Sequence, residues 1–195
     1  MKENIVEEWW KNEAEQNDLS WYRRAYRNYK FNIRFPVLDI GGGSGGFLKY
    51  HSIQDADILD IGGKESLKGN YNFIKADITK KLPNFDKKFK TIFIMETLEH
   101  IKNPLYLMAQ VYDLLEDEGI CYISIPYTKL DYARKNQKNI YNCHVCRWTE
   151  KEILNQMRKV GFIPQIVQKK RRFKNTAFWL PPCWLVLELR KRLSH

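Results

Sequence analysis

The segment Val37–Gly46 reads VLDIGGGSGG and is the part of the sequence that decides the fold. A short apolar run ends in a cluster of glycines, and Phe47 and Leu48 then supply apolar residues that can open a helix. Glycine allows both a sharp backbone turn and the close approach of a ligand to the main chain. The free N–H groups at the start of the following helix favour polar or anionic ligand groups. The segment therefore predicts a strand, a ligand-binding loop and a helix, in that order.

Two kinds of loop fit these glycines. Gly41, Gly43 and Gly46 match the G-x-G-x-x-G pattern of dinucleotide-binding proteins. Gly41, Gly43 and Gly45, preceded by Asp39, match the (D/E)-x-G-x-G-x-G loop of enzymes that use S-adenosylmethionine. The loop alone leaves both cofactors open.

Strands and helices alternate around this loop. A capped helix is predicted over Asn103–Leu115, where an asparagine N-cap and a proline at the first helical position precede one apolar face. A capping box at Thr149–Glu152 opens a second helix, which ends at Gly161. Alternation of this kind predicts an α/β fold with a parallel sheet between helices. The predicted strands are Pro36–Ile40, Asp57–Ile61, Tyr71–Lys75, Thr91–Met95 and Ile120–Ile125.

The two ends of the chain carry other patterns. Residues 3–31 are crowded with aromatic side chains, and we interpret them as two helices that form either a packing cap or an aromatic lid over a ligand. Ile163–Val167 and Thr176–Leu180 are predicted to form an antiparallel pair at the sheet edge. We therefore divide the chain into an N-terminal helical cap, 1–34, and a main domain, 35–195.

Composition limits the class of protein. The chain has 195 residues, of which 44% are hydrophobic, and this fits one globular domain with its own core. Only 4 cysteines argue against a disulfide-built secreted domain. The first residues lack the apolar stretch of a signal peptide, and no run reaches the ~18 apolar residues of a membrane span, so we expect a cytoplasmic protein.

Four segments after the glycine loop carry a family resemblance. Together with the loop they resemble the class I S-adenosylmethionine-dependent methyltransferases, in particular the small single-domain type 11 and type 23-like group with a variable substrate cap. The resemblance covers about residues 35–168 and departs from the family at Glu118-Gly119, where most members have Pro-Gly. It implies a doubly wound, Rossmann-like, seven-stranded and mostly parallel sheet. The segments are Phe73–Ile78, Phe93–Pro104, Leu115–Pro126 and His144–Phe162.

The same resemblance implies methyl transfer from S-adenosylmethionine, which leaves S-adenosylhomocysteine, and it assigns cofactor-binding residues by position. The glycines approach the methionine and ribose portions, Asp60 holds the ribose hydroxyls, and Asp77 with the backbone of Ile78 recognises the adenine edge. Asp39 supports the loop or the ammonium group of the cofactor. The implied residues are Asp39, Gly41, Gly43, Gly45, Asp60, Ile61, Asp77, Ile78, Met95 and Glu96.

Two histidines are candidates for a catalytic base. A neutral imidazole can take a proton near neutral pH. His100 belongs to the Leu-Glu-His of the fourth-strand motif, where a structural role is the alternative. His144 lies in the segment after the fifth strand, which borders the acceptor pocket in this family.

Metal binding is the less favoured alternative. Glu96, Glu99 and His100 match the E-x-x-E-H pattern of ubiquinone-pathway O-methyltransferases, in which the resemblance would imply a divalent cation. Cys143 and Cys146 form a lone C-x-x-C, which lacks the second pair of a structural zinc site. We therefore predict no metal.

The acceptor follows less directly from the sequence. We expect a small molecule that is methylated on oxygen or nitrogen. The formal charge of +10, with basic residues dense in Lys169–Lys174 and in the apolar-basic tail, leaves open an RNA methyltransferase or an O-methyltransferase of a lipid or surface saccharide that docks on a membrane. The tail is otherwise interpreted as an edge strand and a packing helix. Outside the class, the glycine loop leaves an NAD-dependent oxidoreductase and a non-catalytic binding module as alternatives.

Overall fold

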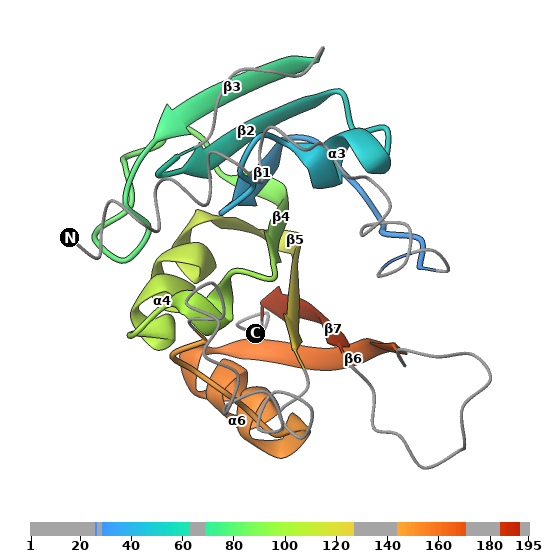
Figure 1. Ribbon diagram of the computed structural model, residues 1–195, viewed down its shortest axis with the longest axis vertical. Helices are drawn as coiled ribbons and strands as arrows, with labels where there is room; N and C mark the ends of the chain where they lie inside the picture. The colour runs from blue at the N-terminus through green and yellow to red at the C-terminus, as the bar shows by residue number, and fades with distance from the viewer. Residues whose placement is uncertain (1–25, 27–28, 63–68, 127–143, 171–183, 192–195) are drawn as a thin grey trace, which may run out of the picture.

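The computed structural model describes Tyr26 and residues 29–62, 69–126, 144–170 and 184–191. These residues form one seven-stranded sheet with helices on both sides (Figure 1). The strands are β1 Val37–Ile40, β2 Asp55–Asp60, β3 Asn70–Lys75, β4 Phe89–Met95, β5 Leu115–Pro126, β6 Phe162–Lys170 and β7 Trp184–Lys191. The helices are α3 Gly46–Tyr50, the 3-10 helix η1 Leu98–His100, α4 Pro104–Leu114 and α6 Glu150–Val160.

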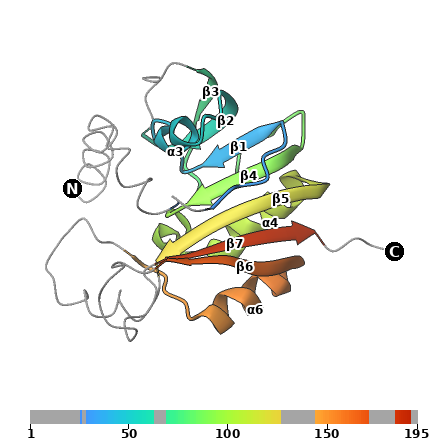
Figure 2. The ribbon, with the colours of Figure 1, turned by 90° about the vertical axis from the view of Figure 1, so that its right-hand side faces the viewer.

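The sheet confirms the predicted doubly wound topology. Its strand order is β3-β2-β1-β4-β5-β7-β6, so the chain runs outward from β1 to one edge and then crosses to the other side of β1. β1 to β5 are parallel, whereas β7 is antiparallel to both of its neighbours. Figure 2 shows the arrows of β1, β4 and β5 pointing the same way and that of β7 pointing back. The carboxyl ends of the parallel strands therefore share one edge of the sheet.

Most strand boundaries differ from the prediction by one to three residues, and two of the differences change the description of the fold. β2 ends at Asp60, so Ile61 lies in the turn beyond it. β5 begins at Leu115, five residues before the predicted start. Leu115 pairs with Phe89 of β4, and a register shift follows before Thr91 pairs with Ile120, so residues 115–119 form an irregular extension of the strand.

Alternate residues of the central strands face two separate cores, as a period-2 pattern requires. In β4, Ile92 and Ile94 belong to one core and Phe93 and Met95 to the other. α4 and α6 pack against each other and close the first core on one side of the sheet, and α3 lies on the other side (Figure 1). Residues of α3 and the ring of Tyr26 belong to the second core. Burial on both faces explains why these strands are nearly continuous apolar runs.

The helix ends follow the capping signals. The side chain of Asn103 accepts a hydrogen bond from the backbone N–H of Tyr106. The Thr149 side chain accepts from the backbone N–H of Glu152, and the Glu152 carboxylate accepts from that of Thr149, which completes the predicted box. Gly161 ends α6 with φ 116°, a value that L side chains rarely adopt.

The C-terminal region differs from its prediction. Thr176–Leu180, expected to pair with β6, lies outside the described residues, and the strand that pairs with β6 is β7. Leu185, Leu187 and Leu189 of β7 are fully buried between β5 and β6. The interpretation of residues 184–191 as a packing helix or a membrane-surface segment is therefore wrong, because their apolar side chains belong to the core.

Described basic residues of this region lie against carboxylates. The pairs are Lys169–Glu150, Arg190–Glu188 and Lys191–Asp117. These pairs reduce the free positive charge that the sequence suggested there for a polyanionic partner. The remaining basic residues of that cluster, 171–174, and the predicted cap helices up to Ala25 lie outside the described residues. Among the helices that the structure describes, none is long and apolar enough to cross a membrane.

Replacing Thr149 by Ala should destabilise the protein by about 1 kcal/mol, because the first turn of α6 loses the hydroxyl that accepts from the backbone N–H of Glu152 and donates to its carboxylate. The melting temperature should fall by roughly 2–4 °C. Lys151→Ala, an exposed change in the same helix turn, is the matched control and should leave it nearly unchanged. Equal melting temperatures for Thr149→Ala and the wild type would show that the box does not stabilise α6.

Candidate functional site

The predicted site residues meet at the carboxyl edge of the parallel strands. Asp39 and the glycines lie at the end of β1, and Asp60 and Ile61 at the end of β2. Asp77 and Ile78 follow β3, and Met95 and Glu96 close β4. In open α/β sheets this edge, beside the strand where the order reverses, is where ligands bind.

The glycine loop has the backbone of a ligand cradle. Gly41, Gly43 and Gly45 all have positive φ angles, between 54° and 80°. A Cβ at Gly41 would overlap the side chain of Thr97, so this position has no room for another residue. A Cβ at Gly43 would meet no atom within 4 Å, so the backbone there borders open space. Because Gly41 has no side chain, the loop can pack directly against Thr97. At Gly43 the backbone is instead accessible from outside the protein.

Asp60 holds the loop from the second strand. One carboxylate oxygen accepts a hydrogen bond from the backbone N–H of Gly43 at 2.9 Å, and the other accepts from that of Gly62 at 2.8 Å. A carboxylate oxygen can accept two hydrogen bonds, so each keeps capacity for a ligand hydroxyl. Ile61, the next residue, is 45% exposed and offers an apolar surface at the same edge.

Asp39 lies beneath the loop and is almost fully buried. Burial, together with the nearby Asp60 carboxylate, raises the pKa of Asp39 to about 8. Its Oδ2 atom is buried and has no hydrogen-bond partner among the described residues. Asp39 is therefore mostly a neutral acid at pH 7 in the absence of a cation, a state that the resemblance to the family did not suggest.

Asp77 organises the turn after β3. Its Oδ1 atom accepts hydrogen bonds from the backbone N–H and the hydroxyl of Thr79, and Lys80 lies 3.2 Å from its Oδ2 atom. The hydrogen bonds from Thr79, and then the charge of Lys80, lower the pKa of Asp77. Asp77 is thus an anion at neutral pH in a partly exposed turn at the predicted site.

The turn after β4 adopts an unusual backbone conformation. Glu96 has φ 52°, in the left-handed region, which costs a residue with a side chain on the order of 1 kcal/mol. Its backbone N–H donates to both the hydroxyl and the carbonyl oxygen of Ser124, at the end of β5. The hydroxyl of Tyr26 lies 2.7 Å from that of Ser124. Neither Ser124 nor Tyr26 was singled out from the sequence as a site residue. For Ser124 the sequence offered one signal, a polar residue inside the apolar run of β5.

The two candidate histidines lie together beside one buried carboxylate. The rings of His100 and His144 are in edge contact with centroids 5.0 Å apart, and both Nε2 atoms are 3.9 Å from Oε1 of Glu99. The carbonyl oxygen of Glu99 accepts hydrogen bonds from the backbone N–H groups of Val145 and Cys146. The segment after β5 is thereby fastened to η1, and His144 is brought to the turn that follows β4.

The donor atoms of Glu99, His100 and His144 all lie within 4.8 Å of one another. This grouping differs from the E-x-x-E-H pattern, since His144 takes part and Glu96 does not. Cys143, the partner of Cys146 in the C-x-x-C, lies outside the described residues, and the thiol of Cys146 donates to the carbonyl oxygen of Ile101.

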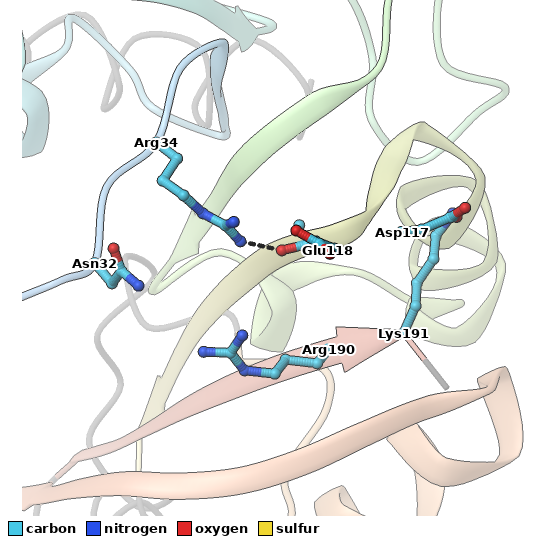
Figure 3. A pocket seen from close by; sticks show the side chains of 7 residues that line it. Asn32, Arg34, Asp117, Glu118, Arg190 and Lys191 are labelled. Carbon is cyan, nitrogen blue, oxygen red and sulfur yellow. Dashed lines mark hydrogen bonds and ion pairs between the residues drawn. The ribbon is translucent and has the colours of Figure 1, made fainter. Parts of the chain in front are cut away.

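A separate hollow of about 250 Å³ opens at the opposite edge of the sheet (Figure 3). It is lined by Asn32 and Arg34 before β1, by the start of β5 and by the end of β7. Arg34 donates to the carbonyl oxygen of Glu118, and Lys191 pairs with Asp117 (Figure 3). No predicted site residue contributes to this hollow, so it is not part of the candidate site.

Replacing Asp39 by Asn should remove a pH-dependent loss of stability. Asp39 keeps its proton up to about pH 8 when folded, but releases it near 3.8 when unfolded. The folded state therefore holds an extra proton in this window, and the stability of the ligand-free wild type should fall as pH rises, by up to roughly 1.4 kcal/mol per pH unit.

Denaturant unfolding of both proteins between about pH 5 and about pH 8 measures the effect, because other carboxylates cancel in the difference. The advantage of Asp39→Asn over the wild type should grow steadily across this range. A difference that does not change with pH would mean that Asp39 ionises normally in the fold.

Comparisons with known proteins agree with this geometry. A family model described as a methyltransferase domain matches residues 11–165. The ubiquinone biosynthesis O-methyltransferase of Glaesserella parasuis is 29% identical over 144 residues, which are 63% of this chain and 60% of that protein. The chain therefore matches less than two thirds of that relative's length.

Solved structures share the fold. A S-adenosylmethionine-dependent methyltransferase from Thermotoga maritima superposes with a TM-score of 0.68 at 17% identity, covering 89% of each chain. The plantazolicin methyltransferase BpumL, in complex with a monoazolic desmethylPZN analogue and S-adenosylhomocysteine, gives a TM-score of 0.64 at 18% identity, covering 97% of this chain and 90% of that one. The family model spans most of the chain, and the strand order and glycine loop have the expected form. The chain thus belongs to the class I S-adenosylmethionine-dependent methyltransferases.

Proposed function

We propose that this methyltransferase acts on an oxygen or nitrogen atom of a small-molecule acceptor, with His144 as the base. The observation that carries the proposal is the position of His144, which lies beside the buried Glu99 and is fastened to the turn after β4. The similarity to an O-methyltransferase of ubiquinone biosynthesis supports a hydroxyl acceptor, which must lose its proton on methylation.

The described residues fit the cofactor. The accessible backbone at Gly43 and the remaining hydrogen-bond capacity of Asp60 suit the ribose, and the exposed side chain of Ile61 suits the adenine ring. Asp77 and the backbone of Ile78 follow β3 at the same edge and would read the adenine amino group. Bound S-adenosylmethionine supplies an electrophilic methyl group on a sulfonium.

Asp39 suits the cationic part of that cofactor. A positive charge near a buried carboxylic acid lowers its pKa and favours the anion. The positive charge of the cofactor would then compensate the negative charge of Asp39, and the Oδ2 atom, which has no partner among the described residues, would gain a hydrogen bond from the loop. We propose that cofactor binding converts Asp39 from the neutral acid to the carboxylate.

The protein's part in the reaction is orientation and proton removal. Methyl transfer is an in-line displacement, so most of the rate enhancement comes from holding the acceptor in line with the methyl group. The side chain of His144 is 12% exposed, so it is accessible yet held by its neighbours. An imidazole in this place can take the acceptor proton, and the Glu99 carboxylate can stabilise the imidazolium that forms.

Asp60→Asn should weaken the binding of S-adenosylhomocysteine roughly 10- to 100-fold, because the amide cannot accept hydrogen bonds from both ribose hydroxyls. Isothermal titration calorimetry measures the change. Asp57→Asn is the matched control: it removes a carboxylate of the same strand that pairs with Lys87 and should leave the affinity within about twofold. Unchanged affinity in Asp60→Asn would exclude Asp60 from the ribose site.

His144→Ala should reduce methyl transfer roughly 100-fold or more while leaving S-adenosylhomocysteine affinity unchanged. The assay is the formation of S-adenosylhomocysteine with a panel of phenols, carboxylic acids and amines. Lys102→Ala, an exposed change next to η1, serves as the folding control.

Excess chelator separates the two roles that the Glu99, His100 and His144 grouping allows. Full activity in chelator is expected if His144 is a base. Loss of activity in chelator, restored by a divalent cation, would show that His144 acts as a metal ligand and not as the base. Full turnover by His144→Ala would remove the residue from the reaction.

A further inference from the structure

Tyr26 reaches the site from a distant part of the sequence. It is 1% exposed, and its ring lies edge-on to Phe31 and Phe47 with centroids 6.0 Å and 5.5 Å away. Its hydroxyl lies 2.7 Å from the hydroxyl of Ser124, which is 98 residues further along the chain and fully buried. The ring therefore accounts for packing, whereas the hydroxyl makes a separate polar contact inside the protein.

That polar contact continues to the turn after β4. The hydroxyl oxygen of Ser124 accepts the backbone N–H of Glu96 at 2.9 Å. A serine hydroxyl rotates freely about its Cβ–Oγ bond unless a partner holds it, and Tyr26 is such a partner. Tyr26, Ser124 and Glu96 are thus linked by two successive hydrogen bonds, the first buried and the second partly buried, and each bond orients the next.

Glu96, the last residue in this series of hydrogen bonds, has a strained backbone. Glu96 is in the left-handed region, and such a conformation persists only where neighbouring contacts hold it. The next residue, Thr97, fills the space that a side chain at Gly41 would need. A change in the backbone at Glu96 would therefore shift Thr97 and, with it, the glycine loop.

We propose that Tyr26 is a positioning residue of the cofactor site: through Ser124 it holds Glu96 in the left-handed conformation that sets Thr97 against Gly41. The inference rests on the methyltransferase function of this edge of the sheet, but not on which acceptor is used. It assigns to the N-terminal segment a role in cofactor binding in addition to packing.

Tyr26→Phe tests the proposal, because phenylalanine keeps the ring and removes only the hydroxyl. We expect the affinity for S-adenosylhomocysteine, measured by calorimetry well below the melting temperature, to fall roughly threefold to tenfold, the effect of one hydrogen bond. Tyr71→Phe is the matched control, since it removes a hydroxyl bond of 2.6 Å to the carbonyl oxygen of Ile53 near the sheet edge. It should lower the melting temperature but change the affinity less than twofold.

A second background separates positioning from general stability. Glycine adopts the left-handed region without strain. In Glu96→Gly, adding Tyr26→Phe should therefore change the affinity less than twofold, although it should still lower the melting temperature. A purely structural tyrosine would instead affect the melting temperature alike in both backgrounds and leave the affinity alone.

Ser124→Ala provides an independent arm. It removes the hydroxyl that links Tyr26 to Glu96 and should weaken the binding of S-adenosylhomocysteine about as much as Tyr26→Phe does. The double variant should show no further loss of affinity. Affinity within twofold of the wild type in both single variants overturns the proposal, as does an equal loss on adding Tyr26→Phe to Glu96→Gly. Absence of S-adenosylhomocysteine binding by the wild type would instead contradict the cofactor assignment itself.

Discussion

The cofactor site depends on a close contact between two turns, the one after β1 and the one after β4. These strands are parallel neighbours, so their chains leave the sheet side by side at the same edge. Thr97 occupies the space next to Gly41, and the backbone N–H of Gly41 donates to the carbonyl oxygen of Leu59 on β2. A side chain at Gly41 would overlap Thr97 and push the loop away from the turn after β4. The absence of a single Cβ thus lets three strands contribute to one ligand surface.

Features that depend on near neighbours in the sequence could be predicted. The glycine loop, the Asn103 cap, the Thr149–Glu152 box and the Gly161 stop each involve residues within a few positions of one another, and each has the expected geometry. The five parallel strands were also predictable, because burial on both faces makes them apolar runs. These signals were sufficient for the fold class and for bringing the predicted site residues to one edge of the sheet.

Features that depend on distant partners could not be predicted in the same way. Two apolar segments, 176–180 and 184–191, could each have paired with β6, and nothing local distinguishes them. The structure places 184–191 beside β6 and, on its other side, beside β5, where Leu185, Leu187 and Leu189 are fully buried. Arg190 at the end of this strand finds its carboxylate in Glu188, so the polar end stays at the surface.

The candidate site shows the same limit. The raised pKa of Asp39 arises from burial under its own loop and from Asp60, a combination visible only after folding. The approach of His144 to Glu99 depends on backbone hydrogen bonds between segments more than forty residues apart, as with Val145 and Glu99. Motif spacing could name these residues, but not the contacts that raise the pKa of Asp39 and place His144 beside Glu99.

The turn after β4 is the point where two segments from distant parts of the chain attach. Glu96, within it, receives the hydrogen bond chain from Tyr26, in the N-terminal segment, and Glu99 fastens His144, in the segment after β5. Both segments attach through backbone groups of this turn, which any sequence can supply. The attachment at Glu99 uses backbone groups on both sides, so the side chains of Val145 and Cys146 can change without breaking it, whereas the link from Tyr26 to Glu96 requires the hydroxyls of Tyr26 and Ser124. The position of this turn thus depends on the N-terminal segment, and the position of the candidate base depends on the segment after β5.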